Sequence, residues 1–130
     1  MSISMTIRQL KPMMRTWDIQ GSIDFYTQVL GFRCLAFNEE WGWASLQWDR
    51  AEIMLSGPNE HENDERPVFT GSLYMICDDV DQHWRSLRDR VKVCYPIETF
   101  EYGMREFAIY DNNGYLLQFG TPTTGDEGDN

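Results

Sequence analysis

The feature of this 130-residue sequence that most constrains its fold is a duplication: the residue pattern predicts the same order of secondary-structure elements twice. Residues 5–14 alternate loosely, as in a strand, and Pro12 suits an edge or hinge position there. A helix is predicted from Asp18 to Gly31, because apolar residues recur at helical spacing and glycine commonly ends a helix. Three strands complete the first half, at 32–38, 41–48 and 52–56.

The second half repeats this order at a distance of about sixty residues, which is too long for a solenoid repeat. A strand at 71–77 precedes a helix that begins at 78–81, and three further strands follow at 93–96, 104–110 and 115–120. Gly42 precedes the turn at Asp49 in the first half, and Gly103 precedes the turn at Asp111 in the second. The two halves therefore agree in detail as well as in order.

We predict from this duplication an α+β fold in which two βαβββ modules form one pseudo-symmetric cupped sheet. Clefts between such modules are preferred ligand sites. The predicted parts are a first module at 1–57, an acidic linker loop at 58–69, a second module at 70–121 and a disordered acidic tail at 122–130.

The formal net charge of −10 argues against a nucleic-acid partner and against docking on an anionic membrane. Much of the acidity lies in the loop 60–66 and in the tail, where solubility explains it. The rest is compatible with a cationic ligand.

The cysteines Cys34, Cys77 and Cys94 are odd in number and widely spaced, so we predict neither a disulfide framework nor a zinc site. This usage favours a reducing cytoplasm. The N-terminus has no signal-peptide pattern, and no apolar run reaches the length of a membrane helix.

Two segments resemble a known superfamily. They are DIQGSIDFY at 18–26, running on to VLGF at 29–32, and the hairpin YGMREF at 102–107 with DNNGYLLQFG at 111–120. Both are similar to motifs of the vicinal oxygen chelate superfamily, which includes glyoxalase I, extradiol dioxygenases and bleomycin-resistance proteins. The family usually has Asp-Pro-Asp-Gly at the last turn, where this chain has Asn112 and Asn113. The resemblance, closest to the bleomycin-resistance branch, implies paired βαβββ modules and a homodimer, but no single activity.

The resemblance also places the metal-ligand positions of the family's enzymes at Lys11, Met54, Ser72 and Gln118. An ammonium, a thioether, a hydroxyl and an amide do not hold zinc, nickel or iron. Shifting the alignment toward Glu52 adds one carboxylate and no histidine. His61, in the acidic loop, and His83, on the second helix, are expected to be solvated surface residues. We therefore expect no metal and no cofactor.

If the ligand positions that the resemblance implies are taken to face inward, side-chain alternation assigns a cleft face to each strand. It directs Ile53, Leu55, Leu117 and Phe119 into the core, and it directs polar and aromatic side chains to the cleft. The predicted ligand-binding residues are Lys11, Trp43, Ser45, Gln47, Glu52, Met54, Ser72, Tyr74, Tyr102, Glu106, Tyr110 and Gln118.

Several of these residues are equally compatible with a structural role. Trp43, like Trp41 and Trp48, could simply pack the sheet, Tyr102 could pack on its own hairpin, and Lys11 could extend to solvent. Arg105 is expected to bind a carboxylate near the second helix.

The resulting hypothesis is a non-catalytic protein that sequesters a small aromatic or cationic compound, as in antibiotic resistance. Flat aromatic walls stack on planar rings, and carboxylates attract cations. The alternative is a lyase, isomerase or dioxygenase of the same superfamily with no metal or an atypical one, in which Glu52, Tyr74 or Glu106 acts as acid or base. A partner-binding module that uses the loop 58–67 and the tail is a third hypothesis.

Overall fold

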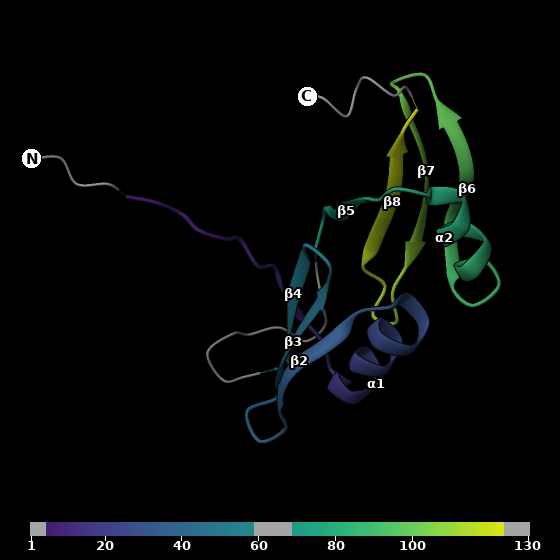
Figure 1. Cartoon of the computed structure of the whole chain (residues 1–130). Coiled ribbons are helices and arrows are strands. Elements are labelled where there is room, and N and C mark those ends of the chain that lie inside the picture. Colours follow the sequence, from purple (N-terminus) through teal and green to yellow (C-terminus); the bar gives the residue numbers. More distant parts are fainter. Residues whose placement is uncertain (1–4, 59–68, 124–130) are drawn as a thin grey trace, which may run out of the picture.

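The computed structural model describes residues 5–58 and 69–123 and has two modules side by side (Figure 1). Each module contains one short sheet and one main helix. The elements of the first module are β1 (Met13–Arg15), α1 (Ile19–Asp24), the π-helix η1 (Phe25–Leu30), β2 (Arg33–Asn38), β3 (Trp43–Trp48) and β4 (Ala51–Ser56). Those of the second are β5 (Ser72–Ile76), α2 (Val80–Leu87), β6 (Lys92–Phe100), β7 (Met104–Tyr110) and β8 (Leu116–Pro122). No helix in the described part of the chain could span a membrane.

The two sheets have the same topology. Their strand orders are β1-β4-β3-β2 and β5-β8-β7-β6, and in each the first strand pairs parallel to the last. The other neighbours pair antiparallel. Gly42 and Gly103 hold positive φ angles at corresponding turns. The α+β fold of two βαβββ modules is thus confirmed.

Aspartate side chains begin both main helices. The Asp18 carboxylate accepts a hydrogen bond from the Gly21 amide at 2.9 Å, and Asp79 accepts one from the Gln82 amide at 3.3 Å. A Cβ at position 21 would collide with the Asp18 carboxylate, so a larger residue there would force the capping side chain to shift. Gly31, at φ 132°, ends the helical segment of the first module.

The core lies on the helix side of both sheets. Leu46, Leu55, Phe107 and Leu117 are fully buried there, and Phe119 stacks on Phe107 at a centroid distance of 5.2 Å. The predicted core faces of these strands are confirmed. The opposite sheet faces carry the polar side chains.

Hydrogen bonds join the two modules where the β7–β8 turn meets α1. The buried Asp111 carboxylate accepts a hydrogen bond from the Tyr26 phenol at 2.6 Å. Asn112 and Asn113 both donate to the Ser22 hydroxyl at 3.0 Å. The departure from Asp-Pro-Asp-Gly in this turn therefore supplies contacts to the first module.

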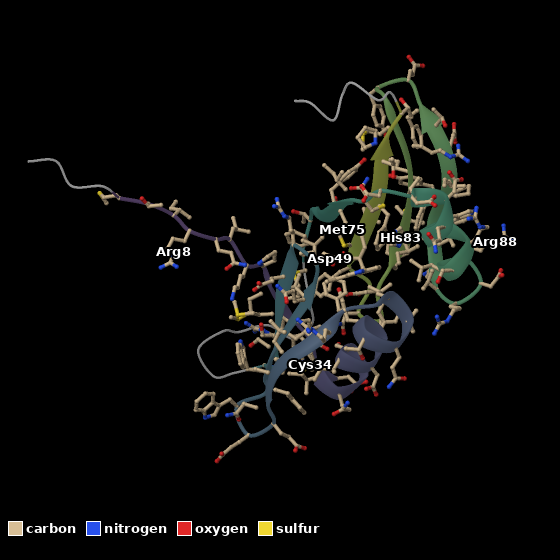
Figure 2. All side chains as sticks on the ribbon, viewed as in Figure 1. Arg8, Cys34, Asp49, Met75, His83 and Arg88 are labelled. Atoms are coloured by element: carbon tan, nitrogen blue, oxygen red, sulfur yellow. The ribbon has the colours of Figure 1, made fainter. Side chains whose placement is uncertain are left out.

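Several sequence-based boundaries were wrong. The first strand covers only Met13–Arg15. Pro12 before it still accepts a hydrogen bond from the Met54 amide at 2.8 Å, and the chain farther upstream extends away from the sheets, as Arg8 does in Figure 2. Trp41 lies in a turn before β3, and β6 is far longer than 93–96, because an edge strand tolerates Pro96. Pro122, assigned to the tail, closes β8. Most of the predicted linker and tail, with His61, lies outside the described residues.

His83 is also not the solvated residue expected. Its ring stacks on Phe119 at 5.9 Å and meets the edge of Trp48 at 5.3 Å. It is half-buried at the junction of the modules because α2 packs over β8 close to the β3–β4 turn.

Candidate functional site

Five polar side chains meet on the face of the second sheet that is turned away from the helix: Ser72, Tyr74, Tyr95, Glu106 and Gln118. We call them the Glu106 cluster. The strand register brings them together, because Tyr74 lies opposite Gln118, and Ala108 lies opposite both Gln118 and Tyr95. The small Ala108 side chain lets Tyr95 and Gln118 meet above it.

Glu106 is the centre of this cluster and is only 1% exposed. The Tyr74 phenol donates to its Oε1 at 2.6 Å, and the Tyr95 phenol donates to its Oε2. Gly120 lies opposite Glu106 in the register, and a Cβ there would collide with the Tyr74 phenol. Glycine at this position is therefore what lets Tyr74 reach the carboxylate.

Gln118 links the rest of the cluster to Glu106. Its Oε1 accepts from the Ser72 hydroxyl at 2.6 Å, and its Nε2 donates to the Tyr95 phenol oxygen at 2.8 Å. Each hydrogen bond thus points toward the carboxylate, from Ser72 through Gln118 and Tyr95 to Glu106.

The tyrosines of the cluster hold their protons strongly. Burial, followed by the hydrogen bond to Glu106, raises the pKa of Tyr95 to about 12 and raises the pKa of Tyr74 further. Ionising either phenol would place a second negative charge beside a carboxylate in a poorly solvated site. Both phenols therefore remain hydrogen-bond donors to Glu106 at neutral pH.

A second, more exposed polar group occupies the equivalent face of the first sheet. Lys11 Nζ lies 3.0 Å from Glu52 Oε1, and Gln47 donates to Glu52 Oε2 at 3.1 Å. The pKa of Glu52 is lowered mainly by the hydrogen bond from Lys11. The Trp43 indole N–H points to the Met54 sulfur at 3.4 Å.

The twelve predicted ligand-binding residues therefore fall into separate groups. Ser72, Tyr74, Glu106 and Gln118 belong to the Glu106 cluster. A second group lies at the first sheet: Trp43, the buried Ser45 and Gln47 on β3, Glu52 and Met54 on β4, and Lys11 just before β1. Tyr102 is 65% exposed in a turn and stacks on Phe100 at 5.3 Å, and it borders the Glu106 cluster, because burial followed by a hydrogen bond to Glu106 raises its pKa. Tyr110 points to Cys94 at 3.3 Å, with the Lys92 ammonium 5.4 Å above its ring.

Tyr95 is the member of the Glu106 cluster that the sequence did not single out. The strand that contains it was predicted to cover only residues 93–96, and its side chains were not assigned to the cleft or to the core. Two register shifts also interrupt the pairing of β6 with β7.

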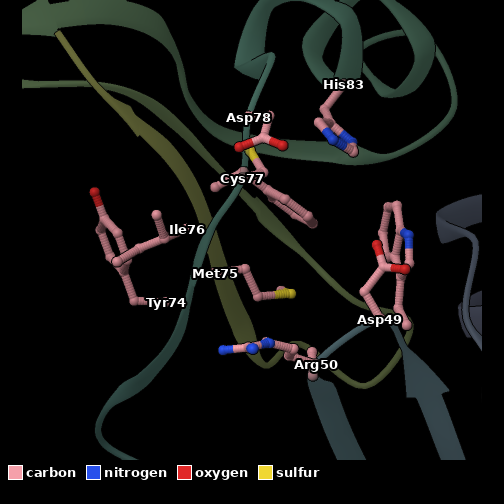
Figure 3. Close-up of a pocket in the computed structure, with 11 residues that line it drawn as sticks. Asp49, Arg50, Tyr74, Met75, Ile76, Cys77, Asp78 and His83 are labelled. Atoms are coloured by element: carbon pink, nitrogen blue, oxygen red, sulfur yellow. The ribbon is translucent and has the colours of Figure 1, made fainter. Parts of the chain in front are cut away.

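Two cavities lie at the junction of the modules. One of about 270 Å³ is lined by Glu52, Ser72 and Tyr74 together with Leu10 and Pro12. The other, of about 530 Å³, runs between the β3–β4 turn and β5. Figure 3 shows Asp49 and Arg50 of that turn beside this second cavity, with Met75 and His83 of the second module. Tyr74 lines both cavities and so connects the Glu106 cluster to the junction.

Residues 8–119 match the sequence profile of the Glyoxalase/Bleomycin resistance protein/Dioxygenase superfamily. The chain belongs to this superfamily.

Solved structures share the superfamily fold at low sequence identity. A protein of unknown function from Agrobacterium tumefaciens superposes with a TM-score of 0.75 at 20% identity, covering 91% of this chain and 96% of that one. TioX from Micromonospora sp. gives 0.72 at 19% identity, over 88% and 98% of the two chains. An integron cassette protein from V. cholerae gives 0.67 at 25% identity, over 92% and 98%. No curated protein matches the sequence.

The metal-ligand positions that the superfamily resemblance assigned do not form a metal site here. The Lys11 ammonium is paired with Glu52, and the Gln118 carbonyl already accepts from Ser72. Among the described residues, no three His, Cys, Asp or Glu side chains gather as ligands would. This donor set does not fit a divalent metal of the superfamily's enzymes.

Proposed function

We propose that this superfamily member binds a small aromatic or cationic molecule and releases it unchanged. The observation that carries the proposal is the Glu106 cluster, a hydrogen-bonded polar centre with aromatic side chains around it. Tyr95 meets the edge of Phe100 at 5.9 Å, and Phe100 stacks on Tyr102. Flat rings beside a buried carboxylate favour planar and positively charged ligands.

The hydrogen bonds of the cluster argue for binding rather than catalysis. A general acid or base must have a free atom within reach of the substrate proton. Both Glu106 oxygens accept from phenols whose pKa values are raised, so neither phenol is poised to give up its proton near neutral pH. Glu52 is likewise held by Lys11 and Gln47.

Equilibrium dialysis and calorimetry against a panel of planar compounds, including bleomycin-like cations, test the proposal. We expect saturable binding, with the compound recovered intact by mass spectrometry after prolonged incubation. Turnover of a panel compound would support the superfamily-enzyme alternative instead. Absence of binding to every member of the panel would refute the proposal.

We further propose that the binding form is a homodimer in which residues 5–11 contact a second copy. This segment carries Met5, Ile7 and Leu10, which are 80–92% exposed, and two basic residues in an acidic chain. Among residues 5–58 and 69–123, no strand pairs with the outer edge of β5, which lies beside both junction cavities, and an unpaired edge can accept another strand. Deleting residues 1–11 should convert a dimer to a monomer in light scattering and weaken binding of the panel compounds. An unchanged mass would contradict this arrangement.

Location and physiological role complete the proposal. The free cysteines Cys34, Cys77 and Cys94 fit a reducing cytoplasm. Sequestration there would raise the tolerance of a cell to a toxic ligand, which growth assays with panel compounds can measure. Equal growth with and without the protein, at any concentration of a compound it binds, would argue against a resistance role.

A further inference from the structure

The direction of the hydrogen bonds in the Glu106 cluster determines which chemical groups can bind there. A hydroxyl has one proton, and a glutamine amide has two. The protons of Ser72, Tyr74 and Tyr95 are all donated within the cluster. Gln118 uses one of its two N–H groups on Tyr95. The five side chains therefore retain a single N–H donor among them.

Acceptor capacity, by contrast, remains abundant. The Tyr74 phenol oxygen donates its proton to Glu106 and keeps its lone pairs, and Tyr74 is 41% exposed, so a ligand can reach it. Tyr95 is half-buried beside it, and its oxygen accepts one hydrogen bond from Gln118 and keeps one further lone pair; the Ser72 oxygen also keeps its lone pairs.

Within the part of the chain that the structure describes, no basic side chain balances the charge of the cluster. Among the described residues, no lysine or arginine forms an ion pair with Glu106, whereas Glu52 and Asp81 are paired with Lys11 and Arg105. A buried carboxylate held only by neutral donors still attracts a positive charge, because the low local dielectric screens it weakly.

We infer that the Glu106 cluster recognises a cationic N–H donor on a planar ligand, an amidinium, guanidinium or aryl-ammonium group, with the oxygens of Tyr74 and Tyr95 as its acceptors. The ring of such a ligand would lie against the aromatic group of Phe100 and Tyr102. Carboxylates and phosphates are excluded, because they bring acceptors to acceptors and negative charge to negative charge. This inference rests on the proposed function and narrows it to one class.

Three isosteric probes separate the possibilities: benzamidine (a cationic donor), benzamide (neutral) and benzoate (an anionic acceptor). Calorimetry at neutral pH should rank benzamidine first, with benzamide at least about tenfold weaker and benzoate without measurable binding. Glu106→Gln should weaken benzamidine by about tenfold, a loss of about 1.4 kcal/mol. Glu39→Gln, which makes the same change in net charge on the exposed β2–β3 turn, should have no effect.

NMR of the wild-type chain locates the site without any variant. Benzamidine should shift the ring resonances of Tyr74 and Tyr95 and leave Trp43 unchanged. The inference is overturned if benzoate binds as well as benzamidine, if Glu106→Gln binds benzamidine normally, or if the shifts fall on Trp43. It is also overturned if none of the probes binds. In each case the proposed function survives when other panel compounds bind intact, and falls separately when none does.

Discussion

Tyr26→Phe removes one hydroxyl from the contact that joins the two modules. Tyr26 is fully buried, and its phenol donates to Asp111 Oδ2 at 2.6 Å. Asp111 Oδ1 keeps its bonds from the Asn113 and Tyr115 amides, so the variant leaves one carboxylate oxygen without its donor. A hydrogen bond to a charged group stabilises by about 1.5–3 kcal/mol, so we expect a loss of about 2 kcal/mol. With an unfolding entropy of about 2.1 cal/mol/K per residue, this lowers the Tm by about 7 °C.

The pH dependence gives this prediction a second readout. Burial raises the pKa of the Asp111 carboxyl, and the Tyr26 hydrogen bond partly lowers it again. A group with a raised folded-state pKa loses stability as the pH rises through that value. Because the variant raises this pKa further, its deficit relative to wild type should be small in acid and larger at neutral pH.

Thermal and urea unfolding at several pH values measure both effects. Tyr110→Phe is the matched control, since its phenol is only half-buried and contacts a cysteine sulfur, and it should change stability by no more than about 0.5 kcal/mol. Equal stability of the two variants, or a deficit for Tyr26→Phe that grows in acid, would refute the reasoning.

Three further predictions concern single residues. Lys11→Met should raise the pKa of Glu52 toward its ordinary value in carboxyl NMR titrations, because the hydrogen bond from Lys11 lowers this pKa in the wild type. The stability that the ionised Glu52 adds is present above its unfolded-state pKa and is lost as the pH falls through its folded-state pKa. Glu106→Gln should lower the pKa of Tyr95 from about 12 in alkaline absorbance titrations, and an unchanged value would mean that burial alone holds the proton. Gly114→Ala should cost about 1–2 kcal/mol in urea unfolding through its φ of 93° alone, because a Cβ there has open space; a neutral effect would contradict this.

The fold could be predicted because its evidence is local and occurs twice. Helix caps at Asp18 and Asp79, apolar periodicity and turn glycines each follow from short-range chemistry. The same alternation placed Leu55 and Leu117 in the core, as the structure confirms. The expected pairing of Arg105 is confirmed by its contacts with Asp81 at 3.0–3.2 Å.

Less of the site than of the fold could be predicted from the sequence, because the contacts in the site depend on strand register and on the direction of each hydrogen bond. Tyr95 was not predicted as a site residue, because the pairing of its strand contains two register shifts. His83 was misplaced because its partners, Trp48 and Phe119, lie on other elements. No pattern in the sequence could show that the phenols of Tyr74 and Tyr95 both donate their protons to Glu106. Whether the predicted residues bind a ligand stays a prediction.

A crystal of the wild-type protein soaked in a crude cell extract tests the account most directly. We predict density for a nitrogen-bearing planar molecule on the Glu106 cluster, within hydrogen-bond distance of the Tyr74 oxygen. Density for an ion bound by three or more protein donors near Lys11, Met54, Ser72 and Gln118 would contradict it.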